Sequence, residues 1–150
     1  MQITIEDASI RHLDRLNEIE KECFKGEAFT KSQIGQLLAD YNSVGLVARE
    51  AGVIVGFVIG VIYVGGNSSS GHILTIDVSP SHRGKGTGKL LLREIEKIFR
   101  QKRAKTISLE VREDNAVALS LYRKLGYHEA GMLKNYYGKT HGIYLKKVLA

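Results

Sequence analysis

The sequence lacks the features that mark secreted and membrane proteins. Its only cysteine, Cys23, cannot form an internal disulfide, which favours a reducing, cytoplasmic setting. No N-terminal segment resembles an export signal. The longest apolar run, residues 53–64, is shorter than the about 20 residues of a membrane-spanning helix, and its β-branched residues favour a buried strand. Gly56 and Gly60 within this run are interpreted as points of close backbone packing.

The chain also lacks long linkers, repeats and low-complexity tracts. With 150 residues, of which 43% are hydrophobic, it predicts one domain covering residues 1–150. The formal net charge of +6 favours an anionic partner without specifying a mechanism.

Hydrophobic periodicity predicts a mixed α/β order. Strands are expected near residues 2–6, 44–49, 53–64, 72–78, 106–111, 127–133 and 142–148. Four helices are expected: one near residues 9–22, one that starts at residue 30, one that follows the glycine-rich stretch and ends near residue 102, and one between residues 115 and 126. The sequence "TKSQ" from Thr30 predicts a capping box, Asn115 a helix N-cap and Gly126 a position just after a helix. Residues 65–71, "GGNSSSG", are predicted to form a loop.

The stretch "SPSHRGKGTGKLLL", residues 79–92, lies between a predicted strand and a predicted helix. Free N–H groups at such a helix start bind phosphate oxygens, and Arg83 and Lys85 could add charge-assisted contacts. The alternative is a basic turn before an ordinary helix. A Walker A loop is excluded because Arg83 and Leu90 stand where it needs glycine and a hydroxyl, and a dinucleotide fingerprint fails at Leu91.

The register that fits is R-x-x-G-x-G, formed by Arg83, Gly86 and Gly88 after "TIDVSP". It resembles the acetyl-CoA pyrophosphate loop of the GCN5-related N-acetyltransferase (GNAT) family, and "LEVREDNAVALSLYRKLGY" at residues 109–127 is similar to a second cofactor-binding segment of that family. The resemblance implies an α/β (α+β) fold with a single mixed, mostly antiparallel sheet of about seven strands flanked by about four helices.

Within the family the sequence is most similar to the RimI and NatA-type protein N-terminal acetyltransferases. The similarity covers nearly the whole chain and includes "GHILTIDV", "LEVR", "NYY" and "CFKGEAF". The sequence departs from the pattern at Gly26, Asp77 and residues 141–142. The resemblance implies acetyl-CoA as cosubstrate, no metal, and these cofactor-binding residues: Ile76, Asp77, Val78, Arg83, Gly84, Lys85, Gly86, Thr87, Gly88, Asn115 and Tyr122.

The expected chemistry requires removal of a proton, because a terminal α-ammonium has a pKa near 8. The resemblance implies Glu110 as the proton acceptor, His72 as a second base and Tyr122 as the acid that protonates the leaving thiolate. A backbone N–H near Val78 would stabilise the oxyanion if the family's strand bulge is present. Pattern alone also allows a solvated Glu110, a structural His72 and a core Tyr122, and Cys23 is interpreted as a buried small hydrophobe.

The acceptor site is expected between two loops. The resemblance implies that Phe24, Glu27 and Phe29 lie over the substrate backbone. It also implies that Tyr136 and Tyr137 cover the substrate from the other side. A narrow slot of this kind would admit an extended N-terminus and exclude a lysine side chain presented mid-chain. The tyrosines could equally be ordinary packing residues.

The leading hypothesis is a cytoplasmic enzyme that acetylates protein N-termini, including ribosomal or nascent chains, as a monomer or homodimer. The alternative within the fold is an acetyltransferase for lysine side chains or small amines. The alternative from another class is a catalytically inactive RNA- or ribosome-binding module, which the presence of Glu110 and Tyr122 disfavours. No membrane association and no specific nucleic-acid binding are expected.

Overall fold

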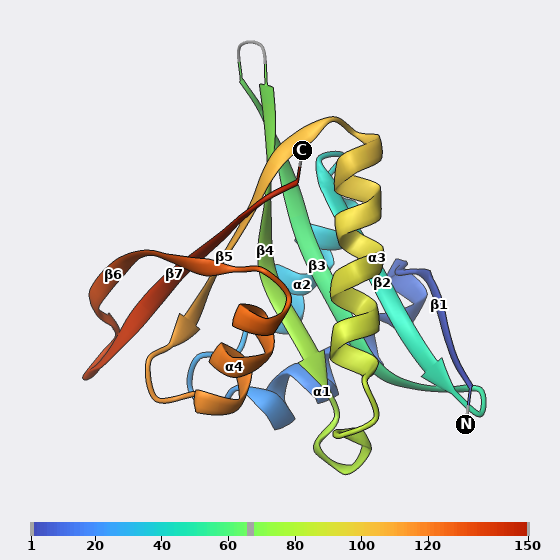
Figure 1. The fold of residues 1–150 in the computed structure, drawn as a ribbon. Helices are drawn as coiled ribbons and strands as arrows, with labels where there is room; N and C mark the ends of the chain where they lie inside the picture. The colour runs from blue at the N-terminus through green and yellow to red at the C-terminus, as the bar shows by residue number, and fades with distance from the viewer. Residues whose placement is uncertain (1, 66–67, 150) are drawn as a thin grey trace.

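The computed structural model describes residues 2–65 and 68–149, which build one seven-stranded sheet with helices on both faces (Figure 1). The strands are β1 Ile3–Asp7, β2 Ser43–Glu50, β3 Val53–Gly65, β4 Ser68–Val78, β5 Ala104–Arg112, β6 His128–Tyr137 and β7 Thr140–Val148. Their order is β1-β2-β3-β4-β5-β7-β6, and every neighbouring pair is antiparallel except β4 and β5. The predicted mixed, mostly antiparallel sheet is confirmed.

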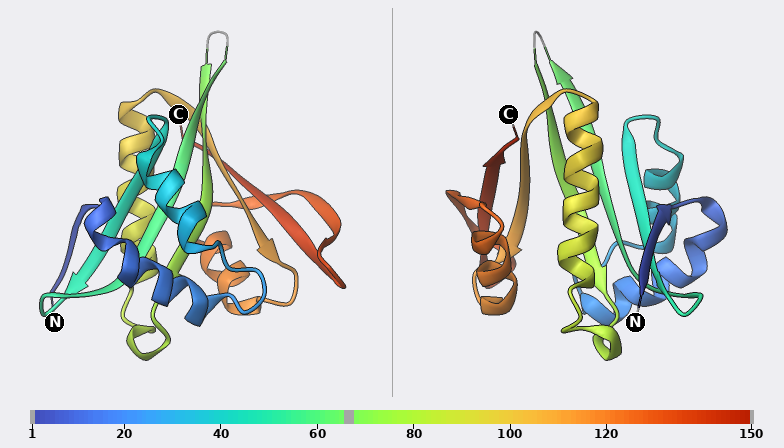
Figure 2. Two further views of the ribbon diagram at one scale, coloured as in Figure 1. Left: turned by 180° about the vertical axis from the view of Figure 1, so that it is seen from behind. Right: turned by 45° about the vertical axis from the view of Figure 1, so that its right-hand side comes forward.

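Four α-helices cover the sheet in the described ranges: α1 Leu13–Cys23, α2 Lys31–Ala39, α3 Thr87–Gln101 and α4 Ala116–Lys124. The helices α1 and α2 lie on one face and α3 and α4 on the other (Figure 2). Each face has its own apolar cluster, one centred on Leu16, Ile34 and Phe57 and the other on Leu91, Ile95 and Phe99. None of these helices is long and apolar enough to cross a bilayer.

The start of α2 and the turn between β2 and β3 depend on residues close together in the sequence. Thr30 accepts a hydrogen bond from the Gln33 N–H at 3.1 Å, and the Gln33 side chain accepts from the Thr30 N–H at 2.8 Å, so the capping box is confirmed. The hairpin between β2 and β3 turns at Ala51 and Gly52, which both have positive φ.

The serine-rich segment was wrongly predicted as a loop. Residues 68–71 belong to β4 and pair with the end of β3, from Ile62↔Gly71 to Gly65↔Ser68. Backbone pairing in this long hairpin overrides the loop-like composition. Gly65 belongs to β3, and the other two residues of the predicted loop, Gly66 and Asn67, lie outside the described residues. Strand β6 is also longer than predicted, since it continues to Tyr137.

The glycines of the central strands allow helix α3 to pack closely. A Cβ atom at Gly56 would lie 2.7 Å from the Asp77 carbonyl oxygen, and one at Gly60 would lie 2.9 Å from Phe99 Cζ. A Cβ at Gly71 would overlap the Phe99 ring. The interpretation of Gly56 and Gly60 as points of close backbone packing is confirmed.

Candidate active site

Strands β4 and β5 pair at one end of the sheet and diverge at the other. Their pairing ends at His72↔Ser108, although β4 continues to Val78 and β5 to Arg112 (Figure 1). The expected bulge is present in β4 at Leu74, where the register with β3 shifts. Beyond His72 the edge of β4 that faces β5 therefore has no strand partner.

The backbone of β4 presents hydrogen-bonding groups along this unpaired edge. The Ser79 N–H donates to the Val55 carbonyl of β3 at 2.8 Å. Because backbone groups alternate in direction along a strand, the N–H and C=O groups of Ile76 and Val78 point away from β3. The Val78 carbonyl accordingly accepts from Arg83 Nε at 3.0 Å. Backbone groups of β4 therefore point toward β5 along this edge.

The glycine loop, residues 83–88, leads from this edge into helix α3. Gly84 and Gly86 have φ angles of 80° and 82°, and Gly86 is the N-cap without a side-chain cap hydrogen bond. The first N–H of the helix that donates to a backbone carbonyl is that of Leu90, and its acceptor is the Gly86 carbonyl. Thr87 Oγ1 is buried without a hydrogen-bond partner. The unpaired N–H groups and this orphaned hydroxyl fit an anionic ligand such as a pyrophosphate.

The two basic side chains of the glycine loop have protein partners. Arg83 donates to the Val78 carbonyl and to Cys23 Sγ, and Lys85 Nζ lies 3.0 Å from the buried Glu50 carboxylate. The predicted contacts of Arg83 and Lys85 with a phosphate would require both side chains to leave these protein partners. The backbone of the loop is the part already available to a ligand.

Cys23 is a packing residue in this arrangement. Its thiol donates to the Val78 carbonyl at 3.4 Å. Burial, with Asp77 nearby, raises the pKa of Cys23 to about 11, so the thiol is protonated at neutral pH. This agrees with its interpretation as a small hydrophobe and not a nucleophile.

His72 and Glu110, the two residues predicted as bases, are hydrogen-bonded to each other. Ser108, Glu110 and Arg112 share one face of β5 because side chains alternate along a strand. His72 Nε2 lies 3.0 Å from Glu110 Oε1, and His72 Nδ1 lies 2.7 Å from Ser108 Oγ. Both side chains of the pair remain partly exposed, at 16% and 18%. The structure thus brings a carboxylate and an imidazole together just where β4 and β5 diverge.

Tyr122 lies on α4, in the apolar cluster on the α3 side of the sheet. It is buried and packs edge to face against Tyr127, with ring centroids 5.8 Å apart. Burial, with Asp77 and Tyr137 nearby, raises the pKa of Tyr122, so its hydroxyl holds a proton at neutral pH. The residue is both a core aromatic and a potential proton donor.

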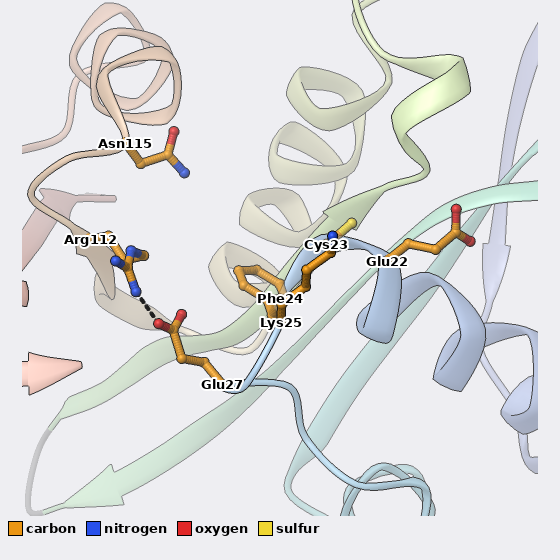
Figure 3. A pocket seen from close by; sticks show the side chains of 7 residues that line it. All are labelled: Glu22, Cys23, Phe24, Lys25, Glu27, Arg112 and Asn115. Atoms are coloured by element: carbon orange, nitrogen blue, oxygen red, sulfur yellow. Dashed lines mark hydrogen bonds and ion pairs between the residues drawn. The ribbon is translucent and has the colours of Figure 1, made fainter. Parts of the chain in front are cut away.

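The acceptor loop, residues 24–30, is tied to the end of β5 by an ion pair between Glu27 and Arg112 (Figure 3). A pocket of about 380 Å³ lies beside this pair. Its lining residues are Glu22, Cys23, Phe24, Lys25, Glu27, Arg112 and Asn115. Phe29 does not line the pocket, because it packs against the apolar cluster of α1 and α2.

Arg112 organises the site and was missed as a site residue in the sequence. Its guanidinium contacts Glu27, lies 3.0 Å from an Asp114 oxygen, and donates to Thr140 Oγ1 at 3.0 Å. It also lies 5.6 Å from the ring centroid of Tyr137. The alternation along "LEVR" places it on the face of Glu110, which is the signal that could have identified it.

Tyr136 and Tyr137 lie at the end of β6, and the Tyr137 ring lies next to Arg112. Their rings meet edge to face with centroids 4.9 Å apart, and Tyr136 is exposed. Burial raises the pKa of both hydroxyls, and the Glu110 charge adds to the effect. Both tyrosines are therefore within electrostatic reach of the His72 and Glu110 pair.

Asn115 lines the pocket and also caps α4, since its side chain accepts a hydrogen bond from the Ala118 N–H at 3.1 Å. The predicted N-cap is confirmed. Asn115→Ala is expected to lower the free energy of unfolding by about 1 kcal/mol, because it leaves a helix N–H unpaired. Urea denaturation followed by circular dichroism measures this change. Asn115→Ser, which keeps an oxygen acceptor, should retain most of the stability; equal losses in both variants would argue against the capping role.

Comparison with known proteins agrees with this fold. The model of the Acetyltransferase (GNAT) family matches residues 13–127. The chain is 31% identical over 137 residues to the N-alpha-acetyltransferase RimI of Mycobacterium tuberculosis, covering 90% of this chain and 84% of the relative. It is 32% identical over 117 residues to an N-alpha-acetyltransferase of Sulfurisphaera tokodaii, covering 72% and 70%. The crystal structure of Ard1 from Thermoplasma volcanium superposes with a TM-score of 0.89 at 25% identity, covering 100% and 99%. The chain belongs to the GNAT acetyltransferase family.

Proposed function

We propose that the protein transfers an acetyl group from acetyl-CoA to the α-amine of protein N-termini. The observation that carries the proposal is the hydrogen-bonded His72 and Glu110 pair at the divergence of β4 and β5, flanked by the acceptor loop and by Tyr136 and Tyr137. Two relatives that share most of their length with this chain are N-alpha-acetyltransferases. Acetyl-CoA supplies the acetyl group as an activated thioester.

The chain would hold this donor mainly through its backbone. The unpaired N–H groups at the start of α3 suit the pyrophosphate. The backbone groups of Ile76 and the N–H of Val78, which point away from β3, suit an extended, amide-containing arm. Gly84 and Gly86 have open space where a Cβ atom would stand, so a ligand can approach the main chain. Asn115, the N-cap of α4, and Tyr122 on α4 would add side-chain contacts to the donor.

Glu110 and His72 would remove the proton from the acceptor ammonium. The α-ammonium has a pKa near 8 and is mostly protonated at neutral pH, so attack requires a nearby base. Glu110 would accept the proton, directly or through water. His72, held by Ser108 on its other nitrogen, orients the carboxylate and offers a second site for the proton.

Tyr122 would give its proton to the departing thiol. We expect Tyr122→Phe to lower kcat by about tenfold to a hundredfold while acetyl-CoA affinity changes less than threefold, because the ring still packs against Tyr127. Steady-state assays of thiol release and calorimetric titration with CoA measure the two quantities. Tyr41→Phe, at an exposed tyrosine between α2 and β2, is the control. Unchanged turnover in Tyr122→Phe would leave that tyrosine with a packing role only.

The acceptor specificity would follow from the side chains around the acceptor. The Glu27 and Arg112 pair and the neighbouring tyrosine pair would line a narrow slot, which suits an extended N-terminus better than a side chain presented mid-chain. A peptide panel beginning Ser, Ala, Met-Leu or Met-Glu, assayed with acetyl-CoA, tests this directly. Turnover confined to N-blocked lysine peptides or polyamines would replace the proposal with the alternative of a lysine or small-amine acetyltransferase.

A further inference from the structure

Two carboxyl groups are buried together beneath the acceptor loop and take no part in the chemistry described above. Glu20 of α1 and Asp77 of β4 are 1% and 2% exposed, and Thr75 of β4 lies between them. Buried carboxyl groups are costly unless they are neutralised or fully hydrogen-bonded. No cationic side chain forms an ion pair with either carboxyl group within the described ranges.

The hydrogen atoms of this cluster can be counted. Thr75 Oγ1 lies 2.7 Å from Glu20 Oε1 and 2.7 Å from Asp77 Oδ1. A hydroxyl carries one hydrogen and can donate only once, so the second contact is a hydrogen bond only if a carboxyl group donates to the hydroxyl oxygen. One of the two carboxyl groups must therefore be protonated.

The proton belongs to Asp77. Both oxygens of Glu20 act as acceptors, since Oε2 also accepts the Phe29 N–H at 2.9 Å. The second oxygen of Asp77, Oδ2, is buried without a partner, as suits the carbonyl oxygen of a neutral acid. In the resulting chain of hydrogen bonds, the Asp77 acid donates to the Thr75 hydroxyl oxygen, and the Thr75 hydroxyl donates to the Glu20 carboxylate. The same carboxylate accepts from the Phe29 N–H. Burial, followed by the neighbouring Glu20, raises the pKa of Asp77 to about 9.

We propose that Asp77, Thr75 and Glu20 hold a single shared proton that positions the acceptor loop over β4 and thereby sets the affinity for the acceptor. The inference rests on the proposed function only for the identity of the acceptor. Its structural basis is that the chain of hydrogen bonds ends at the Phe29 N–H of the acceptor loop. On the β4 side, the carbonyl of Val78, next to Asp77, accepts from Cys23 and Arg83. The three are positioning residues and touch no reacting group.

The arrangement is sensitive to high pH. Asp77 faces Glu20 and Cys23 from α1, Thr75 from its own strand, Arg83 from the glycine loop and, at longer range, Tyr122 from α4. Since its folded-state pKa of about 9 exceeds the unfolded value near 3.8, stability from this group is fully present below 3.8 and is lost as pH rises toward 9. Above that value two adjacent carboxylates would repel each other, and the contact with Phe29 would weaken.

The first test needs no turnover. Carbon-13 NMR of the side-chain carboxyl groups should show one that titrates near the raised value and is missing in Asp77→Asn. Hydrogen exchange should show that Thr75→Val lowers the protection of the Phe29 amide by about tenfold, because the hydroxyl bridge is lost, while Thr75→Ser and Asp77→Asn keep it within about threefold. Ordinary acidic titration of both carboxyl groups in the wild-type protein, or full Phe29 protection in Thr75→Val, would overturn the proposal.

The second test asks whether the cluster sets acceptor affinity. Thr75→Val should raise KM for a substrate peptide by about tenfold with kcat and KM for acetyl-CoA within about twofold. Asp77→Asn, which can still donate to Thr75, should keep the low peptide KM up to higher pH than the wild type. A fall in kcat at constant peptide KM would overturn the positioning role. Absence of peptide turnover in the wild type would refute the proposed function, and the NMR and exchange results would still decide whether the proton is shared.

Discussion

Glu110→Gln is expected to lower kcat for peptide acetylation by about 10²- to 10³-fold, the largest loss expected of any single substitution in the site. Glutamine keeps the shape of the side chain and a carbonyl oxygen toward His72, which lies 3.0 Å away, but it cannot take a proton from the acceptor. Acetyl-CoA binding should change less than threefold, since the phosphate-binding loop and β4 are untouched. Thiol-release kinetics and calorimetric titration measure the two effects separately.

Glu129→Gln is the matched control, because Glu129 is an exposed carboxylate paired with Arg123 outside the site. It should leave kcat within about twofold. Adding His72→Gln to Glu110→Gln should cost little more than Glu110→Gln alone if the two residues act as one unit. Full turnover in Glu110→Gln would remove this residue as the base, and a larger loss in His72→Gln would assign the proton to the imidazole instead.

The sequence predicted best what depends on local order. The capping box at Thr30 and the cap at Asn115 are contacts between residues three apart, so their spacing was sufficient. Apolar periodicity located α3. The loop prediction for residues 68–71 failed because the pairing of β4 with β3 and β5, and not serine composition, decides their conformation.

The site itself depends on contacts between residues far apart in the chain. His72 and Glu110 meet only because the parallel register pairs His72 with Ser108, a relation no single segment encodes. The resemblance placed both residues near the acceptor but left open which one is the base, and the structure shows a hydrogen-bonded pair. Glu20 and Asp77 are 57 positions apart in the chain, and their burial became visible only when α1 was packed on β4.

The glycine loop is held in place by the packing of α3, and a single ring contributes much of it. Phe99 is fully buried and fills the space left by the missing side chains of Gly60 and Gly71. The same helix begins at Thr87, immediately after the loop that faces the anionic ligand. The position of the loop is therefore linked to the core at the other end of α3.

Phe99→Ala is expected to lower the free energy of unfolding by about 3 to 5 kcal/mol, because the cavity opens onto glycines that have no side chains to fill it. Since the chain has no tryptophan, urea denaturation followed by circular dichroism measures the loss. Val117→Ala, at an exposed position of α4, should change stability by less than about 0.5 kcal/mol. Acetyl-CoA should bind more weakly to Phe99→Ala, since a loosened α3 no longer fixes the N–H groups at its start. A loss below about 1 kcal/mol would mean that the sheet, and not the ring, holds α3 in place.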